Sequence, residues 1–313
     1  MDLHSIVLDT DPGVDDALAI IYALNHPDLQ VHAITTVCGN IGVDQATINT
    51  QIVLSLLDCV VPLAMGQNQP IYYPLQTAPH VHGLDGLGNV SVQFESLEEQ
   101  VVKKSAVELI LDFVAKFPDQ LRLVCIGPLT NIAQAILANS PLMRRTKEII
   151  LMGGAFEQRG NVTTSAEFNI YVDPHAAQIV LESGVPITIL PLDLTHQVIL
   201  SADLLHQATQ CSNAPWRDFT WSITQPCMRF HQHQEGFHGM YLHDPLAVGY
   251  LLRPDLFKTV PAEVRVETSS SSTRGMTVAN LHQQPMTPNA QICVAVKVEQ
   301  FLNHFLQTLL DLP

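Results

Sequence analysis

The chain has 313 residues, 47% of them hydrophobic and 14% charged, and its formal net charge is −15. This charge argues against nucleic acid as a partner, because binding a polyanion depends on neutralising phosphates with Lys and Arg. The apolar content suits a large core with strands covered on both faces, and no segment reaches the length of a membrane span.

The N-terminus lacks a basic segment followed by a long apolar stretch. We therefore expect no signal peptide, no membrane partner and a cytoplasmic location. The six cysteines form no CxxC pattern, and several lie in apolar runs. In a chain of this size such cysteines are expected to be free thiols in a reducing compartment.

Strand-like and helix-like segments alternate through the first two thirds of the chain. Strands are expected near residues 5–10, 30–37, 61–66, 121–126, 147–152 and 186–192. Helices are expected near residues 15–26, 44–58, 104–117, 128–139 and 173–183. This alternation predicts an α/β fold with a mostly parallel central sheet, helices on both faces and a Rossmann-like core.

The remaining segments are less regular. A helix-rich stretch is expected over residues 201–252, a loop over 268–276, late strands over 264–267 and 292–298, and a closing helix over 299–311. Residues 67–100 show no clear strand or helix, and a loop of that length is more often functional than idle. No linker separates two parts, so we expect a single domain over residues 1–313.

Four aspartates lie within eight residues at the end of the first predicted strand and just after it: Asp9, Asp11, Asp15 and Asp16. They lie at the carboxyl end of a strand and in the first turn of a helix, where α/β sheets bind ligands. A single Asp there would most often be a cap, but crowded carboxylates repel one another and lose solvation when buried. The cluster therefore favours a site that holds a cation or a proton. Oxygen-only donors suit Ca²⁺ or Mg²⁺ rather than zinc.

Other polar residues follow later strands. Asp244 opens a helix and is read equally well as a helix N-cap or as a further cation ligand. Glu167 and Asn169 have a spacing that suits binding of vicinal hydroxyls, or they belong to an ordinary polar loop. Asn40 is either another hydroxyl binder or a turn residue.

Two of the fourteen histidines, His82 and His243, lie beside features of the predicted sheet edge. A histidine there could protonate a leaving group near neutral pH. The segment 231–238 holds three more, but His231 and His233 at i, i+2 spacing do not share a helix face. We expect this segment to be a flexible rim rather than a metal site.

The chain resembles the inosine-uridine preferring nucleoside hydrolases, a family of ribonucleoside hydrolases. The resemblance spans almost the whole chain, in the family's order, through LDTDPGVDDALAI, TTVCGN, HVHGLDGLG, GPLTNIA, EIILMGGA, AEFNIYVDP, LDLTHQ and YLHDPLAV. It implies a nucleoside hydrolase-like fold. It also implies Ca²⁺-dependent hydrolysis of the N-glycosidic bond of ribonucleosides, of uridine or inosine type, to free nucleobase and ribose, as part of nucleoside salvage.

The resemblance also implies roles for individual residues. The Ca²⁺ ligands would be Asp11, Asp16, Asp244 and the backbone carbonyl of Ile126, where the family often has Thr. Asp11 would in addition be the general base that activates a metal-bound water, and the sugar would pass through an oxocarbenium-like transition state.

The substrate-binding positions implied in the same way surround the ribose and the base. Those that grip ribose hydroxyls would be Asp15, Asn40, Asn161, Glu167 and Asn169. Met152 would line the ribose pocket through its backbone, and Phe168 would pack beside the sugar or base. His243 would be the leaving-group acid, with His82 as relay or base contact. Related proteins form dimers and tetramers, so we expect a homo-oligomer.

Two other readings stay open. A haloacid-dehalogenase-like phosphatase also begins with a strand ending in Asp-x-Asp, and Asp9 would be its nucleophile. That reading does not account for Asp15, Asp16 or the AEFN and HDP segments. A catalytically silent protein that binds nucleosides or Ca²⁺ would need the ligands but no general base. The preferred nucleobase is not determined, because the segment before His243 varies widely in the family.

Overall fold

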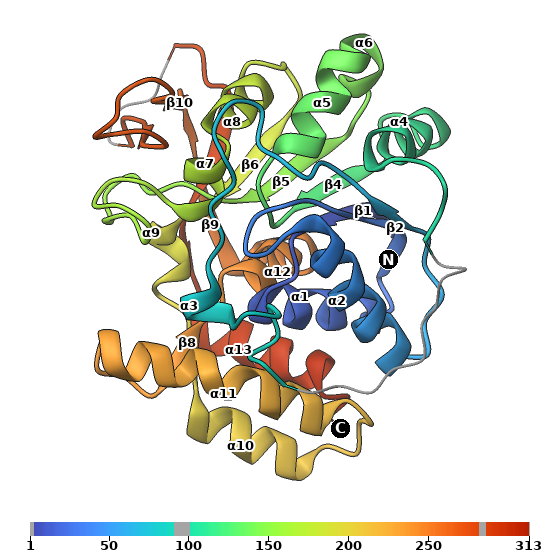
Figure 1. Ribbon diagram of the computed structural model, residues 1–313, viewed down its shortest axis with the longest axis vertical. Helices are drawn as coiled ribbons and strands as arrows, with labels where there is room; N and C mark the ends of the chain where they lie inside the picture. Colours follow the sequence, from blue (N-terminus) through green and yellow to red (C-terminus); the bar gives the residue numbers. More distant parts are fainter. Residues whose placement is uncertain (1–2, 91–100, 282–285, 313) are drawn as a thin grey trace.

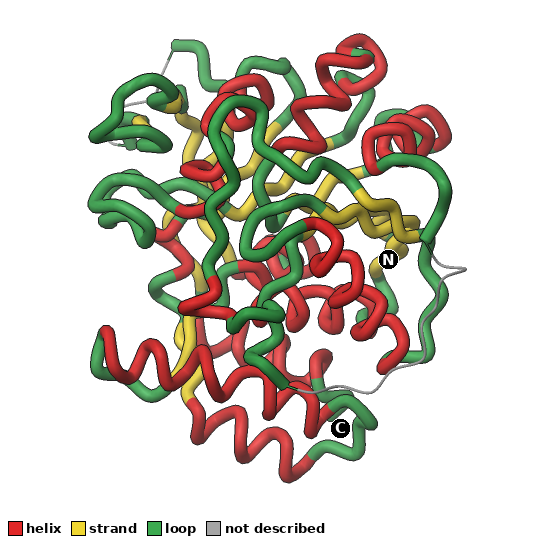
Figure 2. Tube along the Cα trace, viewed as in Figure 1, coloured by secondary structure: helices red, strands yellow, loops and turns green. Residues whose placement is uncertain are grey.

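The computed structural model describes residues 3–90, 101–281 and 286–312. One sheet of eight strands forms the middle layer, between helices on both of its faces (Figures 1 and 2). In spatial order the strands are β3 (Leu63–Met65), β2 (Leu29–Thr36), β1 (His4–Thr10), β4 (Arg122–Cys125), β5 (Glu148–Met152), β6 (Ile187–Leu190), β12 (Ala290–Val296) and β9 (Phe257–Ala262). All neighbours are parallel except β12 and β9. The predicted fold class is confirmed.

Alternate residues of each strand face two separate cores. In β1, Ile6 and Leu8 belong to one core and Val7 to the other, and all three are buried. The first core is covered by α1 (Val14–Asn25), α2 (Val43–Leu56), α12 (Asp244–Leu252) and α13 (Val298–Leu309). The second is covered by α4 (Ala106–Lys116), α5 (Thr130–Ala138) and α8 (Pro174–Leu181). Burial on both faces explains why the strands read as continuous apolar runs.

The order of the strands reverses at β1. The chain moves outward from β1 through β2 to β3, and then returns to add β4, β5 and β6 on the other side of β1. The carboxyl ends of β1 and β4 are therefore adjacent, while the loops that leave them turn in opposite directions. Such a reversal opens a crevice where ligands bind in α/β sheets. It places the aspartates that follow β1 at this crevice.

Further elements lie around the carboxyl edge of the sheet. They are α3 (Pro79–His82), α7 (Phe168–Val172), α9 (Leu192–Thr195), β7 (Ile199–Ser201), α10 (Ala202–Cys211), α11 (Arg217–Gln234) and β8 (Gly239–Tyr241). The short helix α6 (Ser140–Met143) instead follows α5 and leads into the start of β5. The 3₁₀ turn η2 (Pro254–Leu256) and the ribbon of β10 (Arg265–Val266) with β11 (Thr277–Val278) complete the described elements. In Figure 1, α10 and α11 lie on the α1 side of the sheet, far from α4 and α5.

Several sequence predictions need correction. Strand β9 was not predicted, and the strand expected at 264–267 is only the two-residue β10, outside the main sheet. The irregular stretch 67–100 contains the short helix α3, and its residues 91–100 lie outside the described part of the chain. The end of the strand expected at 186–192 is already helix α9. Short edge elements of this kind have little of the apolar periodicity that marks a strand or helix.

The six cysteines are free thiols, as predicted, and four of them are buried. None of the helices in the described residues combines the length and apolar character needed to cross a membrane. The single domain over residues 1–313 stays a prediction.

We predict that Gly249→Ala destabilises the protein, because α12 crosses α13 at this glycine. A methyl group there would overlap the ring of Phe301, which is only 1% exposed. Overpacking of a core costs about 1–3 kcal/mol, and the close overlap with the Phe301 ring puts the cost here in the upper part of that range, at about 2–3 kcal/mol. Alanine returns about 1 kcal/mol of helix propensity. Urea unfolding should therefore show a net loss of about 1–2 kcal/mol.

Phe301→Leu in the Gly249→Ala background serves as the matched control. The smaller side chain should make the double variant more stable than the sum of the two single effects predicts. A Gly249→Ala variant as stable as the parent would contradict this account of the α12–α13 contact.

Candidate functional site

The turn from β1 into α1 holds Asp16 with four hydrogen bonds. One carboxylate oxygen accepts from the Thr10 hydroxyl at 2.6 Å and from the Asp11 amide at 3.2 Å. The other accepts from the Gly13 amide at 3.0 Å and from the Asn40 side chain at 3.2 Å. Asp16 lies in the first turn of α1, where the positive end of the helix dipole also favours a carboxylate. Its position is therefore fixed by two backbone amides of the turn and by the side chains of Thr10 and Asn40.

Asp11 is enclosed by backbone. Its Oδ2 accepts from the Asn40 amide at 2.6 Å, whereas its buried Oδ1 has no hydrogen-bond partner among the residues that the structure describes. A side chain at Gly39 or Gly127 would overlap the Asp11 carboxylate. These two glycines come from the loops after β2 and β4. A buried carboxylate oxygen without a donor is costly unless a cation or proton meets it.

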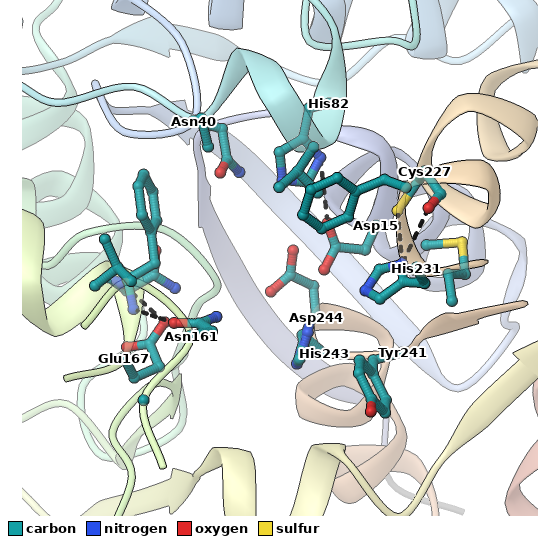
Figure 3. Close-up of a pocket in the computed structure, with 18 of the residues that line it drawn as sticks. Asp15, Asn40, His82, Asn161, Glu167, Cys227, His231, Tyr241, His243 and Asp244 are labelled. Carbon is teal, nitrogen blue, oxygen red and sulfur yellow. Dashed lines mark hydrogen bonds and ion pairs between the residues drawn. The ribbon is translucent and has the colours of Figure 1, made fainter. Parts of the chain in front are cut away.

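Three further carboxylates come together beside Asp11. Oxygen atoms of Asp15, Asp16 and Asp244 lie within 4.8 Å of one another, and all three residues are buried. Asp244 is the first residue of α12, and the helix has no side-chain cap hydrogen bond. The N-cap alternative is therefore wrong for Asp244. Its carboxylate is directed at the other acids instead (Figure 3).

Burial dominates the electrostatics of this cluster. It raises the pKa of Asp15 to about 6, and it raises the pKa of Asp11 well above its usual range, with the charge of Asp16 adding to the effect. The pKa of Asp244 also lies well above its usual range, from burial and from the charges of Asp15, Asp16 and Asp11. Like charges this close stay ionised only with a compensating positive charge.

The donor set fits a hard divalent cation. Ile126 follows β4, and its carbonyl accepts one hydrogen bond, from the Asn169 side chain at 2.9 Å. A second lone pair on that oxygen is left for another partner. With carboxylates of Asp11, Asp16 and Asp244, the donors are all oxygen, which suits Ca²⁺ or Mg²⁺. The three carboxylates that lie closest together are those of Asp15, Asp16 and Asp244. Asp11 is not one of these three, but its charge helps to raise the pKa of Asp244.

A second polar group is built around α7. Glu167 is the N-cap of this helix: its Oε1 accepts from the Asn169 amide at 2.8 Å, and its Oε2 accepts from the Ile170 and Gly154 amides at 3.1 Å. The Asn169 side chain donates to the carbonyls of Ile126 and Met152. Burial raises the pKa of Glu167. Both side chains are therefore oriented in advance by backbone groups.

Asn161 and Phe168 lie at the outer end of this group. The side-chain oxygen of Asn161 accepts from the Phe168 amide at 2.9 Å, and Asn161 itself is exposed. The sequence placed Glu167 and Asn169 in a polar loop or a hydroxyl-binding group. The structure shows a five-residue helix whose cap is Glu167.

His82 faces the acids from α3. The Val14 amide donates to its Nδ1 at 3.1 Å, and Nδ1 is 3.9 Å from Asp15. A ring nitrogen that accepts from an amide carries no proton, so the neutral ring has its proton on Nε2. Burial lowers the pKa of His82 to about 4. His82 is therefore an uncharged hydrogen-bonding group beside Asp15.

His243 lies immediately before Asp244. Its Nδ1 is 2.7 Å from the Thr195 hydroxyl, and its ring centroid is 5.7 Å from those of His196 and Tyr241. Burial lowers the pKa of His243 well below its usual range, with His196 and two other histidines adding to the effect. Thr195, His196 and Tyr241 thus all contact the imidazole of His243.

These groups border one cavity of about 620 Å³, within the range of small-molecule sites. The predicted residues that line it are Asp15, Asn40, His82, Ile126, Met152, Asn161, Glu167, Phe168, Asn169, His243 and Asp244. Asp11 and Asp16 lie beneath its floor, fully buried. Figure 3 shows Glu167 and Asn161 on one side, His231 and Tyr241 on the other, and the acids between them.

The cavity is also lined by aromatic residues that were not predicted as site residues, and His196, His231 and Tyr241 are among them. His196 stacks on Tyr241 at 4.3 Å, and the His231 ring meets Tyr241 edge-on at 5.3 Å. The expected flexible rim at 231–238 is wrong for its first residues, since His231 is buried in the last turn of α11 and His233 on the same helix is exposed. The motif LDLTHQ, which contains His196, was the available signal.

Comparison with known proteins decides the family. Residues 6–303 match the family described as inosine-uridine preferring nucleoside hydrolase. The chain belongs to this family. It is a glycosylase that hydrolyses nucleosides.

Relatives of this nucleoside hydrolase match over nearly its whole length. It is 37% identical to the inosine-uridine preferring nucleoside hydrolase of Crithidia fasciculata, over 95% of this chain and 94% of that protein. It is 39% identical to the non-specific ribonucleoside hydrolase RihC of Salmonella agona, over 96% of this chain and 95% of that protein. The solved purine-preferring ribonucleoside hydrolase from Gardnerella vaginalis superposes with a TM-score of 0.91 at 32% identity, covering 98% of both chains.

We predict that added Ca²⁺ stabilises the nucleoside hydrolase more at about pH 7.5 than at about pH 5. The pKa of Asp15 is raised from 3.8 to about 6, so the folded protein holds protons that the unfolded chain has released. The contribution of this group to the free energy of unfolding therefore falls as pH rises from about 4 to 6. A cation must displace those protons at low pH but not at high pH. The thermal unfolding midpoint of chelator-treated protein, with and without Ca²⁺, measures the difference.

At a Ca²⁺ concentration about 100 times the dissociation constant, the gain should be about 2.7 kcal/mol. Asp16→Asn should remove the gain, because it takes a charge from the cluster. Asp203→Asn, on an exposed position of α10, should keep it. An equal gain at both pH values, or a full gain in Asp16→Asn, would show that the cation binds elsewhere.

Proposed function

We propose that this enzyme is a Ca²⁺-dependent ribonucleoside hydrolase of uridine or inosine type that releases free nucleobase and ribose. One observation carries the proposal: the Oδ1 of Asp11, which has no hydrogen-bond partner among the described residues, lies beside the buried carboxylates of Asp15, Asp16 and Asp244 at the floor of the cavity. Preoriented carboxylate and amide groups of Glu167 and Asn169 lie on the wall of the same cavity. Such a site suits a neutral, hydroxyl-rich substrate that bridges floor and wall.

Asp11, Asp16, Asp244 and the Ile126 carbonyl would hold the cation, with Asp15 in contact with the cluster. When bound, Ca²⁺ supplies a positive charge that lowers the pKa of a water and anchors sugar hydroxyls. The chemistry of the donors supports Ca²⁺ over zinc, because the cluster has neither thiolate nor imidazole ligands among the described residues.

Asp11 would act as the general base. It is fully buried beneath the cavity, and its Oδ1, which has no hydrogen-bond partner among the described residues, can take a proton from the attacking water. The water then bonds to C1′ of the ribose as the C1′–N bond breaks. The electron pair of that bond leaves with the nucleobase.

The ribose would be gripped by Asp15, Asn40, Asn161, Glu167 and Asn169, with the Met152 backbone and Phe168 beside it. Two of these groups, Glu167 and Asn169, are already fixed by hydrogen bonds to backbone amides and carbonyls. Their oxygen atoms need no reorganisation as positive charge develops on the sugar, and preorganised dipoles of this kind stabilise such a transition state.

The base would lie against the aromatic side of the cavity. His243 would donate a hydrogen bond to the departing nucleobase, and His82 would contact the nucleobase as a second hydrogen-bond donor through Nε2. The ring pair of His196 and Tyr241 supplies a flat apolar surface beside His243. This arrangement accommodates more than one nucleobase, because stacking does not distinguish bases by their edges.

The two alternatives are less well supported. A phosphatase with Asp9 as nucleophile requires an accessible carboxylate, but Asp9 is buried and its Oδ1 accepts from Thr35 and Asn131. A catalytically silent binding protein does not fit the family to which the chain belongs, because its relatives are hydrolases.

We predict that Asp11→Asn lowers kcat for ribonucleosides by about 10²- to 10⁴-fold, because the amide cannot take a proton. The asparagine oxygen can still accept from the Asn40 amide, so the thermal unfolding midpoint should stay close to that of the parent. Asp203→Asn is the matched control and should leave kcat unchanged. If Asp11→Asn turns over at the parent rate, Asp11 is not the base.

A ribose-release assay on uridine, cytidine, inosine, adenosine and their 2′-deoxy forms tests the substrate class. We expect release from ribonucleosides that is lost with chelator and restored by Ca²⁺. Removing the 2′-hydroxyl should lower kcat/KM by about 100-fold or more, because buried polar partners would be left unpaired. No release from any member of the panel by Ca²⁺-loaded protein would refute the proposed function.

A further inference from the structure

The imidazole of His243 is held in place by a hydrogen bond and by two neighbouring rings. Its Nδ1 meets the Thr195 hydroxyl at 2.7 Å. The rings of His196 and Tyr241 pack on it at centroid distances of 5.7 Å, and they stack on each other at 4.3 Å. One ring nitrogen is thus occupied, and the ring plane is set by its neighbours. Nε2 is the nitrogen left for a ligand in the cavity.

Thr195 is itself held rigidly. It is the last residue of α9 and is fully buried. Its amide and that of Leu194 both donate to the Pro191 carbonyl, at 3.0 and 2.9 Å. Gln197, just after α9, donates to the Asp193 carbonyl and to the Val294 carbonyl of β12. The Thr195 hydroxyl is therefore presented to His243 from a fixed backbone.

The same short helix also holds the opposite wall of the cavity. The Asp193 carboxylate accepts from three consecutive amides, those of Phe156, Glu157 and Gln158, at 2.6 to 3.0 Å. This loop leads to Asn161 on the ribose side. Helix α9 therefore connects the loop that carries Asn161 with the imidazole of His243.

The direction of the Thr195–His243 hydrogen bond can be inferred by asking which group accepts the proton of the Thr195 hydroxyl. Within the described part of the chain, His243 is the partner found for the Thr195 hydroxyl. If Nδ1 carried a proton and donated it, the hydroxyl proton would be buried without an acceptor, which costs about 1–3 kcal/mol. If the hydroxyl donates to a bare Nδ1, both groups are satisfied. The proton of the neutral imidazole is then on Nε2.

We propose that Thr195 is a positioning residue that holds His243 in its neutral Nε2–H form and aims this N–H at the departing nucleobase. The inference rests on the proposed function. In the step concerned, the C1′–N bond breaks and its electron pair goes to the base. The Nε2–H group donates a hydrogen bond to an acceptor on the base as negative charge grows there, and the proton stays on His243 in this step.

Thr195→Val tests the proposal, because valine keeps the branched shape and removes the hydroxyl. Thr195→Ser keeps the hydroxyl and should restore function. For the best ribonucleoside of the parent, we expect Thr195→Val to lower kcat by about 10- to 100-fold with KM nearly unchanged, as for other residues that orient a catalytic group. Thr195→Ser should stay within about threefold of the parent.

A second substrate distinguishes a misoriented His243 from a general loss of activity in Thr195→Val. In 4-nitrophenyl β-D-ribofuranoside, the leaving group is the stable nitrophenolate anion, which departs without a hydrogen bond from the enzyme. Thr195→Val should therefore cleave it at a rate within about threefold of the parent. Thr220→Val is the matched control, since Thr220 is fully buried in α11 and its hydroxyl has no hydrogen-bond partner in the described part of the chain. It should leave both activities unchanged.

Nitrogen-15 NMR of histidine-labelled protein reads the tautomer without any activity measurement. The His243 signals, assigned through their loss in His243→Ala, should show a protonated Nε2 and a bare Nδ1 in the parent and in Thr195→Ser. They should shift toward a mixture of tautomers in Thr195→Val. This measurement on the parent remains decisive even where Thr195→Val fails to fold.

The outcomes are distinct. A protonated Nδ1 in the parent, an unchanged kcat in Thr195→Val, or an equal loss on both substrates would each overturn the inference and leave the proposed function standing. A Ca²⁺-loaded parent that cleaves neither riboside would refute the proposed function itself, and the catalytic role of Thr195 with it.

Discussion

The rest of the site depends on the repulsion among carboxylates buried at the carboxyl end of β1. Asp11, Asp15, Asp16 and Asp244 lie within one buried region, and the pKa of each is raised by burial. A fold tolerates such a group only if hydrogen-bond donors and a bound positive charge offset the lost solvation. The hydrogen bonds around Asp16 supply the first requirement, and the oxygen-only donor set suits the second.

The topology of the sheet brings the remaining parts to this cluster. Because the strand order reverses at β1, the loops after β1 and β4 diverge and leave a crevice between them. The ribose-side group on α7 joins the floor through the side chain of Asn169, which donates to the carbonyl of Ile126. The residues proposed for the nucleobase side of the cavity are Thr195, His196, Tyr241 and His243. They lie next to the acid cluster because His243 immediately precedes Asp244 in the chain. The two sides of the cavity are thus connected to the acids by the Asn169–Ile126 hydrogen bond and by the peptide bond between His243 and Asp244.

The sequence predicted those parts that local patterns encode. Doubly buried strands such as β1 read as apolar runs, and the acids of LDTDPGVDD follow the first of them directly. Strand β9 escaped prediction because it is an edge strand that is mostly half-buried, contains Lys258 and Pro261, and pairs with β12 on one side only. The role of His231 was missed for a related reason. Spacing alone could not show that α11 buries His231 against the cavity while it exposes His233.

What the sequence by itself determined is the parallel α/β architecture, the acid cluster and the family, because periodicity, composition and motif order are local properties of the chain. Only the tertiary structure decided which groups meet. Thr195 and His243 are 48 residues apart and share a hydrogen bond, and Asp193 holds a loop 35 to 37 residues before it. Such contacts depend on how strands stack side by side and on which face each helix buries. No spacing in the chain encodes that information, so the orientation of the His243 imidazole could be read only from the folded molecule.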